Sequence, residues 1–148
     1  MSAERNKEVV RRVIEEGTNQ KNLAVFDELV SPSFVDHEAG SQPGGLEEEK
    51  ELLSSVAEAF PDWRWDVEEM LAVDDKVITR YVARGTHRGE FMGAAPTGKE
   101  VAITGINIVR VEGGKIVESW GNSDQLGWMR QIGAPVVSTI ITHESAEE

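Results

Sequence analysis

The sequence contains no cysteine, and this absence excludes several kinds of chemistry. Without a thiol the chain has no disulfide framework, no thiolate metal site and no cysteine nucleophile. It also has no apolar run of the length that a membrane span needs, and its opening MSAERNKEVV lacks the apolar stretch of a signal peptide. We therefore expect a cytoplasmic protein with no membrane partner.

Basic residues are few: 15 Lys and Arg stand against 27 Asp and Glu, which gives a formal net charge of −12. This charge would repel phosphates, so we expect no nucleic-acid partner. The three histidines are scattered singly without paired ligand spacing, and we expect no metal site. The PTGK and GGK segments lack the spacing of a phosphate loop, and no Gly-x-Ser-x-Gly motif supplies a hydrolase nucleophile. Carboxylate chemistry without a cofactor remains.

The order of apolar patterns predicts one α+β domain over residues 1–148. Helical spacing predicts three N-terminal helices, near residues 9–17, 23–30 and 46–60. Ser31 and Pro32 would stop the second helix. Strand patterns and a last short helix follow, at 63–73, 76–91, 99–112, 115–124 and 125–133. We expect the three helices to pack on the concave face of one curved antiparallel sheet of about four to six strands.

Two other segments are less specific. The run at 47–51, with four glutamates, crowds the first turns of the third predicted helix, and we interpret it as a solvated face that favours the helix dipole. The core of the domain covers about residues 5–133, and 134–148 is a C-terminal extension. Within the extension, the β-branched run at 136–141 is compatible with a strand, a dimer arm or an ordered extension.

The stretch KIVESWGNSD at 115–124 is unusual for a half-buried strand. Strict alternation would place five side chains on one face of the sheet: Ile116, Glu118, Trp120, Asn122 and Asp124. Polar groups beside an indole are more typical of a pocket lining than of a packed core. Asp124 lies where the strand pattern changes to a helical one, so it can cap the helix or present a carboxylate to the pocket.

Several motifs resemble the SnoaL-like polyketide cyclases, a family of the nuclear transport factor 2-like superfamily. They are FPDW at 60–63, RGTHRGEFMG at 84–93, PTGK at 96–99 and the GGKIVESW run that leads to Asp124. The resemblance implies a cone whose helices and curved sheet enclose a deep, mostly apolar cavity. It also implies that one aspartate, here Asp124, acts as general acid and base in an intramolecular aldol closure without metal or cofactor. The same cone serves isomerases, dehydratases, epoxide hydrolases and binding proteins.

Other residues are candidates for the same pocket. Asn107 shares its strand face with apolar residues, where a lone amide is either a pocket donor or a structural bridge, and we favour the pocket. His37 lies where the family often has a histidine. It is either structural or faces the cavity, where it would orient Asp124 or hold the substrate. The remaining substrate-contact candidates are aromatic or polar: Trp63, Trp65, Tyr81, His87, Trp120 and Asn122. Trp63 and Trp65 either pack in the core or form a pocket wall, and the sequence does not decide whether His87 and Tyr81 face the interior.

The leading hypothesis is a cofactor-free acid/base enzyme that acts on a small, apolar carbonyl compound by aldol-type proton transfer in a deep pocket. Asp124 and His37 are its predicted catalytic residues, with the pKa of Asp124 raised by an apolar site. One alternative is a non-catalytic binding or assembly module in which Asp124 only caps a helix. Another is a hydrolase, isomerase or dehydratase on the same cone. Apolar residues on the opposite strand face, Ile106, Ile108 and Val82, predict a homodimer through the sheets.

Overall fold

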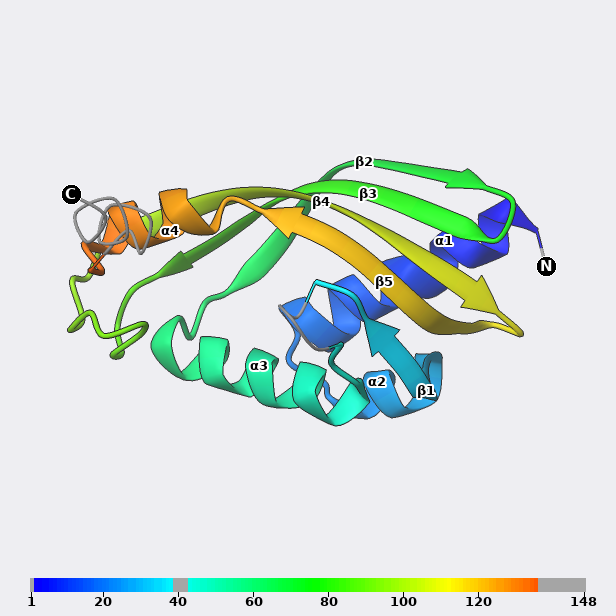
Figure 1. The fold of residues 1–148 in the computed structure, drawn as a ribbon, viewed down its shortest axis with the longest axis horizontal. Coiled ribbons are helices and arrows are strands. Elements are labelled where there is room, and N and C mark those ends of the chain that lie inside the picture. The colour runs from blue at the N-terminus through cyan, green and yellow to red at the C-terminus, as the bar shows by residue number, and fades with distance from the viewer. Residues whose placement is uncertain (1, 39–42, 136–148) are drawn as a thin grey trace, which may run out of the picture.

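The computed structural model of the chain describes residues 2–38 and 43–135 (Figure 1). The helices are α1 (Ala3–Arg12), the π-helix η1 (Val13–Asn19), α2 (Ala24–Leu29), α3 (Leu46–Ala59) and α4 (Gln125–Ile132). The strands are β1 (Val30–Asp36), β2 (Arg64–Val73), β3 (Lys76–Thr86), β4 (Glu100–Glu112) and β5 (Lys115–Ser123). This confirms the predicted order of helices, four long strands and a last short helix. The expected element at 136–141 lies outside the described residues.

The strands form one five-stranded sheet in the order β1-β5-β4-β3-β2. The pairs among β2, β3, β4 and β5 are antiparallel, as predicted, whereas β1 pairs with β5 in parallel. The strand patterns predicted from the sequence begin at residue 63, and the parallel pairing of β1 makes the sheet mixed instead of purely antiparallel. Pro32 lies inside β1 instead of stopping the helix, which ends at Leu29. Proline has no backbone N–H to donate, and an edge strand tolerates it because one side of that strand pairs with no neighbour.

The sheet arches over α1, α2 and α3, which lie on its concave side, as predicted (Figure 1). Ser2 caps α1 by accepting the Arg5 N–H at 3.2 Å, and the helix buries Val10 against the sheet. No helix among the described residues is long and apolar enough to cross a bilayer. On the other side of the sheet, no helix of the described residues covers the strands (Figure 1).

The buried apolar residues form two clusters on the concave side. The first joins η1 and α2 to the sheet and includes Ile14, Phe26, Val77, Val109 and Ile116. The second joins α3 and α4 to the sheet and includes Val56, Phe60, Ala83, Ile103 and Ile132. Trp65 packs against both clusters. The part of the sheet between the clusters is therefore where polar groups can face the interior.

A β-bulge decides which side chains of β5 face that interior. Val111 of β4 pairs with Ile116, but the preceding residue, Arg110, pairs with Glu118, so one residue of β5 has no opposite partner. Beyond the bulge, inward-facing positions of β4 pair with Ser119, Gly121 and Ser123. The other set joins the outer face: Glu118, Trp120 and Asn122. The prediction that Ile116 shares its face with this set is therefore wrong, because a bulge moves every later side chain to the opposite face.

Candidate active site

The floor of the candidate site is a polar strip on the concave face. Thr79, Asn107 and Gly121 lie opposite one another on β3, β4 and β5, and Tyr81, Gly105 and Ser123 form the next row. The Oγ1 of Thr79 and the Oδ1 of Asn107 are buried without a hydrogen-bond partner among the described residues. Each such orphaned atom destabilises the fold by about 1–3 kcal/mol. A bound molecule that donates a hydrogen bond would remove this penalty.

Two glycines allow larger side chains to lie flat on this floor. A Cβ at Gly105 would collide with the ring and hydroxyl of Tyr81 on the neighbouring strand. A Cβ at Gly121 would stand 2.6 Å from the Oε2 of Glu38. Neither glycine can be assigned to the site from the sequence, because only the register between strands shows what lies opposite them.

Three carboxylates, which we call the concave carboxylates, lie over the floor: Asp36, Glu38 and Glu49. Asp36 ends β1, and its Oδ1 accepts the Glu38 N–H at 2.9 Å and the Ser119 hydroxyl at 3.2 Å. Ser123 donates a longer hydrogen bond, 3.4 Å, to Glu38. Glu49 reaches the same place from α3. Within the described ranges, no three His, Asp or Glu side chains are arranged to hold a metal ion.

Glu49 has the most perturbed carboxyl group of the three. The pKa of Glu49 is raised to about 7. Burial is the largest cause, followed by the charge of Asp36, a hydrogen bond with the Asp36 side chain and the charge of Glu38. Burial and the charge of Asp36 also raise the pKa of Glu38, although the bond from Ser123 opposes this. Near neutral pH, Glu49 can therefore accept a proton and return it, which general acid–base catalysis requires.

Tyr81 and Trp65 form an aromatic wall beside these groups. Their rings are stacked, with centroids 3.6 Å apart and planes 5° apart. Asn19, at the end of η1, holds the Trp65 backbone by donating to its carbonyl at 3.0 Å and accepting its N–H at 2.7 Å. Burial, and then the charges of Glu38 and Glu49, raises the pKa of Tyr81 above its ordinary value. The phenol thus stays protonated and can donate a hydrogen bond to a bound oxygen.

The interpretation of the whole glutamate run as a solvated face is wrong at Glu49. Glu47, Glu48 and Glu51 are exposed, but Glu49 is half-buried. It shares its helix face with Leu46, Leu53 and Val56, which are three, four and seven positions away and point inward. This periodicity is visible in the sequence and could have identified Glu49.

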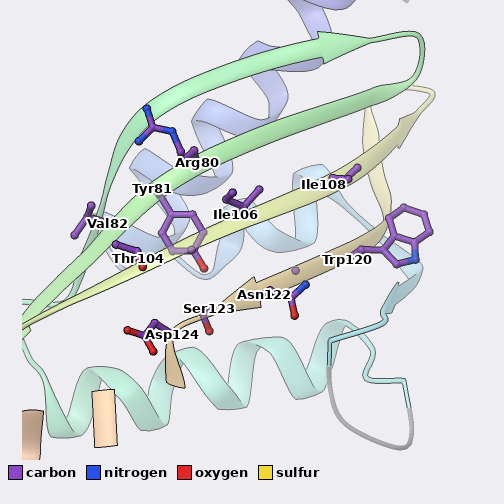
Figure 2. Close-up of a pocket in the computed structure, with 12 residues that line it drawn as sticks. Arg80, Tyr81, Val82, Thr104, Ile106, Ile108, Trp120, Asn122, Ser123 and Asp124 are labelled. Carbon is purple, nitrogen blue, oxygen red and sulfur yellow. The ribbon is translucent and has the colours of Figure 1, made fainter. Parts of the chain in front are cut away.

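The predicted residues Trp120, Asn122 and Asp124 do come together, but in a groove on the outer face. The groove encloses about 550 Å³, and Arg80, Ile106 and Ile108 also line it (Figure 2). Figure 2 shows Asp124 at the end of β5, beyond Ser123. Asp124 is exposed, and it caps α4 by accepting the Gly127 N–H at 2.9 Å. The structure therefore gives this carboxylate the capping geometry.

His37 also lies on the outer side of the sheet. Its Nε2 is 2.9 Å from the Oε2 of Glu118, and its ring stacks on Trp120 with centroids 5.0 Å apart and planes 8° apart. The expected contact of His37 with Asp124 is thus replaced by contacts with Glu118 and Trp120.

The predicted residue Trp63 belongs to the second core cluster, and His87 packs against Phe60 of that cluster. Trp63 is 7% exposed and stacks on Trp128 at 4.9 Å. His87 is fully buried against Phe60, and its Nδ1 accepts the Thr97 N–H at 3.3 Å. This bond holds the loop after β3, so the structure gives His87 structural contacts. Of the nine predicted site residues, it brings Asn107, Tyr81 and Trp65 to the concave site.

Comparisons with known proteins agree with this fold. A family model described as SnoaL-like polyketide cyclase matches residues 8–132. None of the curated proteins matches the sequence.

Among solved structures, IdmH from Streptomyces antibioticus, a candidate polyketide cyclase, is 33% identical with a TM-score of 0.79. The match covers 87% of this chain and 99% of IdmH. AclR from Streptomyces galilaeus, a candidate hydroxylase, is 26% identical with a TM-score of 0.82, over 99% of this chain and 92% of AclR. A candidate SnoaL-like polyketide cyclase from Jannaschia is 26% identical with a TM-score of 0.81, over 90% of this chain and 94% of that protein.

Proposed function

The chain belongs to the SnoaL-like polyketide cyclase family, and we propose that it is a cofactor-free acid/base enzyme acting on a small, largely apolar carbonyl compound at the concave carboxylates. The observation that carries this proposal is the placement of Glu49. Its carboxyl group is half-buried, lies beside Asp36 and has its pKa raised to about 7. A carboxyl group with that pKa exchanges protons with carbon acids far better than one at the solution value.

In the proposed reaction, ionised Glu49 takes a proton from a carbon next to a carbonyl group. The C–H electron pair then forms an enolate, which attacks a second carbonyl of the same molecule and forms a carbon–carbon bond. The resulting alkoxide takes the proton back from Glu49, so the atoms and charges balance. Tyr81 and the amide of Asn107 would stabilise the enolate oxygen, and Trp65 would pack against the apolar part of the substrate.

Asp36 and Glu38 have a supporting role in this scheme. Their negative charges disfavour the ionised form of Glu49 and so raise its pKa toward neutral pH. The serine hydroxyls of Ser119 and Ser123 hold the two supporting carboxylates in place. Asp124 lacks this environment, because its carboxylate is exposed and accepts a backbone N–H.

Deuterium exchange into a carbonyl compound tests the proposal without knowledge of the natural substrate. 1-Tetralone, a bicyclic aryl ketone, would be incubated in D₂O with the wild type, Glu49→Gln or Glu51→Gln, and loss of the α-proton signal followed by NMR. Glu51 lies exposed on the same helix and is the matched control. We expect the wild type and Glu51→Gln to accelerate the exchange and Glu49→Gln to lose the acceleration. An equal rate with Glu49→Gln and the wild type would contradict the role of Glu49.

We also propose that the outer face of the sheet forms a homodimer interface. Ile106 is 50% exposed and Leu71 50%, both on strands whose outer side has no helix over it in the described part. The groove that contains Asp124 is apolar at Ile106, Ile108 and Trp120. A second copy placed on this face would cover these side chains. A monomer in light scattering at micromolar concentration would contradict the interface.

A further inference from the structure

The turn after β1 places successive side chains on opposite sides of β5. Asp36 and Glu38 lie on the concave side, where they accept hydrogen bonds from Ser119 and Ser123. His37, between them, lies on the outer side against Glu118 and Trp120. The His37 N–H donates to the Ser119 carbonyl at 2.9 Å, so the turn is attached to β5 at this residue.

Two contacts fix the His37 ring on the outer side. Its Nε2 lies 2.9 Å from the Oε2 of Glu118, and its face is stacked on Trp120. Glu118 is itself held, because its Oε1 accepts a hydrogen bond from Arg110 at 2.7 Å. The ring therefore cannot move away from β5 without losing both the hydrogen bond and the stacking.

The two concave carboxylates of the turn differ in how firmly they are held. The backbone of Asp36 forms a pair of hydrogen bonds with Gly44, at 2.8 and 3.0 Å. Glu38 has no such pair among the described residues. Its side chain is held by the long bond from Ser123, and its N–H by Asp36. The position of Glu38 therefore depends more than that of Asp36 on the residue between them.

We propose that His37 is a positioning residue, whose contacts with Glu118 and Trp120 on the outer face hold the Glu38 carboxylate over Gly121 on the concave face. The inference for turnover rests on the proposed function, whereas the inference for the position of Glu38 does not. Glu38 contributes negative charge to both Glu49 and Tyr81. Loosening the turn would let the Glu38 carboxylate move away from Gly121 and from Glu49, and this would make Glu49 easier to ionise.

The test is the titration of the Glu38 side-chain carboxyl carbon, followed by NMR in the wild type and three variants. His37→Ala removes both outer contacts, and His37→Phe keeps the stacking but loses the bond to Glu118. Glu69→Ala is the control, because it removes another outer-face ion pair, Glu69 with Arg80 at 3.5 Å, far from the turn in sequence. We expect the pKa of Glu38 to fall toward its ordinary value in His37→Ala, to fall less in His37→Phe and to stay unchanged in Glu69→Ala.

Turnover gives a second readout. In His37→Ala the midpoint of the acid limb of the kcat profile should shift to lower pH, because Glu49 ionises more easily, and in His37→Phe this midpoint should shift less. A Glu38 titration that is the same in His37→Ala and the wild type would overturn the positioning role, whatever happens to turnover. A lower Glu38 pKa in His37→Ala together with an inactive wild type would instead support the positioning role and contradict the proposed function.

Discussion

The two faces of the sheet are built from the same strands but treat polar groups in opposite ways. On the concave face, Thr79 and Asn107 have buried oxygen atoms without a hydrogen-bond partner in the described part of the chain, and the carboxyl group of Glu49 lies where ionisation is unfavourable. On the outer face, charged residues form surface ion pairs such as Arg110 with Glu118, and apolar residues such as Ile106 remain exposed. The concave face thus contains polar groups that reduce the stability of the fold, whereas the charged groups of the outer face are paired or exposed to solvent.

This difference indicates what each face is adapted for. Unpaired buried atoms and a carboxyl group with a raised pKa reduce stability, and proteins retain such features chiefly at functional sites. Exposed apolar side chains on a flat strand surface are typical of association. We therefore assign chemistry to the concave face and assembly to the outer face, although the outer groove of about 550 Å³ contains the predicted site residues Trp120, Asn122 and Asp124.

The largest expected difference in kcat is between substitutions at Glu49 and at Asp124. Glu49→Gln removes the proposed proton-transfer group and should lower kcat by about 10²- to 10⁴-fold. Asp124→Asn should keep kcat within about twofold and leave the melting temperature nearly unchanged, because asparagine caps helices as well as aspartate does. Steady-state kinetics of both variants on one carbonyl substrate checks this. The opposite pattern, with Asp124→Asn inactive and Glu49→Gln active, would assign the chemistry to the outer groove.

The second effect concerns stability as a function of pH. The pKa of Glu49 is raised in the folded state, so the folded protein binds more protons than the unfolded chain between the ordinary value of 4.5 and about 7. Stability should therefore fall as pH rises through that window, by up to about 3 kcal/mol. Glu49→Gln removes this ionisation, so the free energy of unfolding of the variant relative to that of the wild type should increase from pH 4.5 to pH 8.

Urea denaturation at the two pH values measures this difference. Glu51→Gln, on the exposed side of α3, should show no pH-dependent gain. An advantage of Glu49→Gln that is the same at both pH values would mean that Glu49 has an ordinary pKa.

The third effect compares neighbouring positions of β4 on opposite faces. Gly105→Ala would push a Cβ into the ring of Tyr81 and should lower the free energy of unfolding by about 1–3 kcal/mol. Thr104→Val, one residue earlier, adds an apolar group at an exposed outer position and should change it by less than about 0.5 kcal/mol. Equal values from urea denaturation would contradict the close packing of Tyr81 on the floor.

The smallest effect on chemistry is expected for the outer face. Ile106→Glu introduces a charge among apolar side chains and should convert the proposed dimer into a monomer in light scattering. Turnover per chain should stay within about twofold, because Ile106 points away from the concave carboxylates. A tenfold loss of turnover in a folded monomer would show that the two faces do not act independently.

Much of the fold follows from patterns that are local in the sequence. Alternation and turn residues predicted β2, β3, β4 and β5, and helical spacing predicted α3 and the helix after Asp124. The parallel pairing of β1 with β5 could not be predicted in the same way. It joins residues about 80 positions apart, such as Val35 and Glu118, and no periodicity in either segment reports it.

The site was predicted less well, for two physical reasons. The bulge opposite Val111 reverses the faces of Trp120 and Asn122, and a bulge changes the alternation without changing the composition of the strand. Glu49 was missed because its neighbours in the sequence are exposed glutamates, although its helical position is inward. The strand face of Asn107 was predicted correctly, since its strand has an unbroken pairing with β3.

The central claim is that the concave face is an acid/base site in which Glu49 transfers the proton. The most direct test is the titration of the Glu49 side-chain carboxyl carbon by NMR in the protein without ligand. We predict a midpoint near pH 7 that falls when Asp36 is replaced by asparagine, since the charge of Asp36 is the largest cause of the raised pKa of Glu49 after burial. A midpoint at the ordinary value of 4.5, unchanged in Asp36→Asn, would contradict the claim.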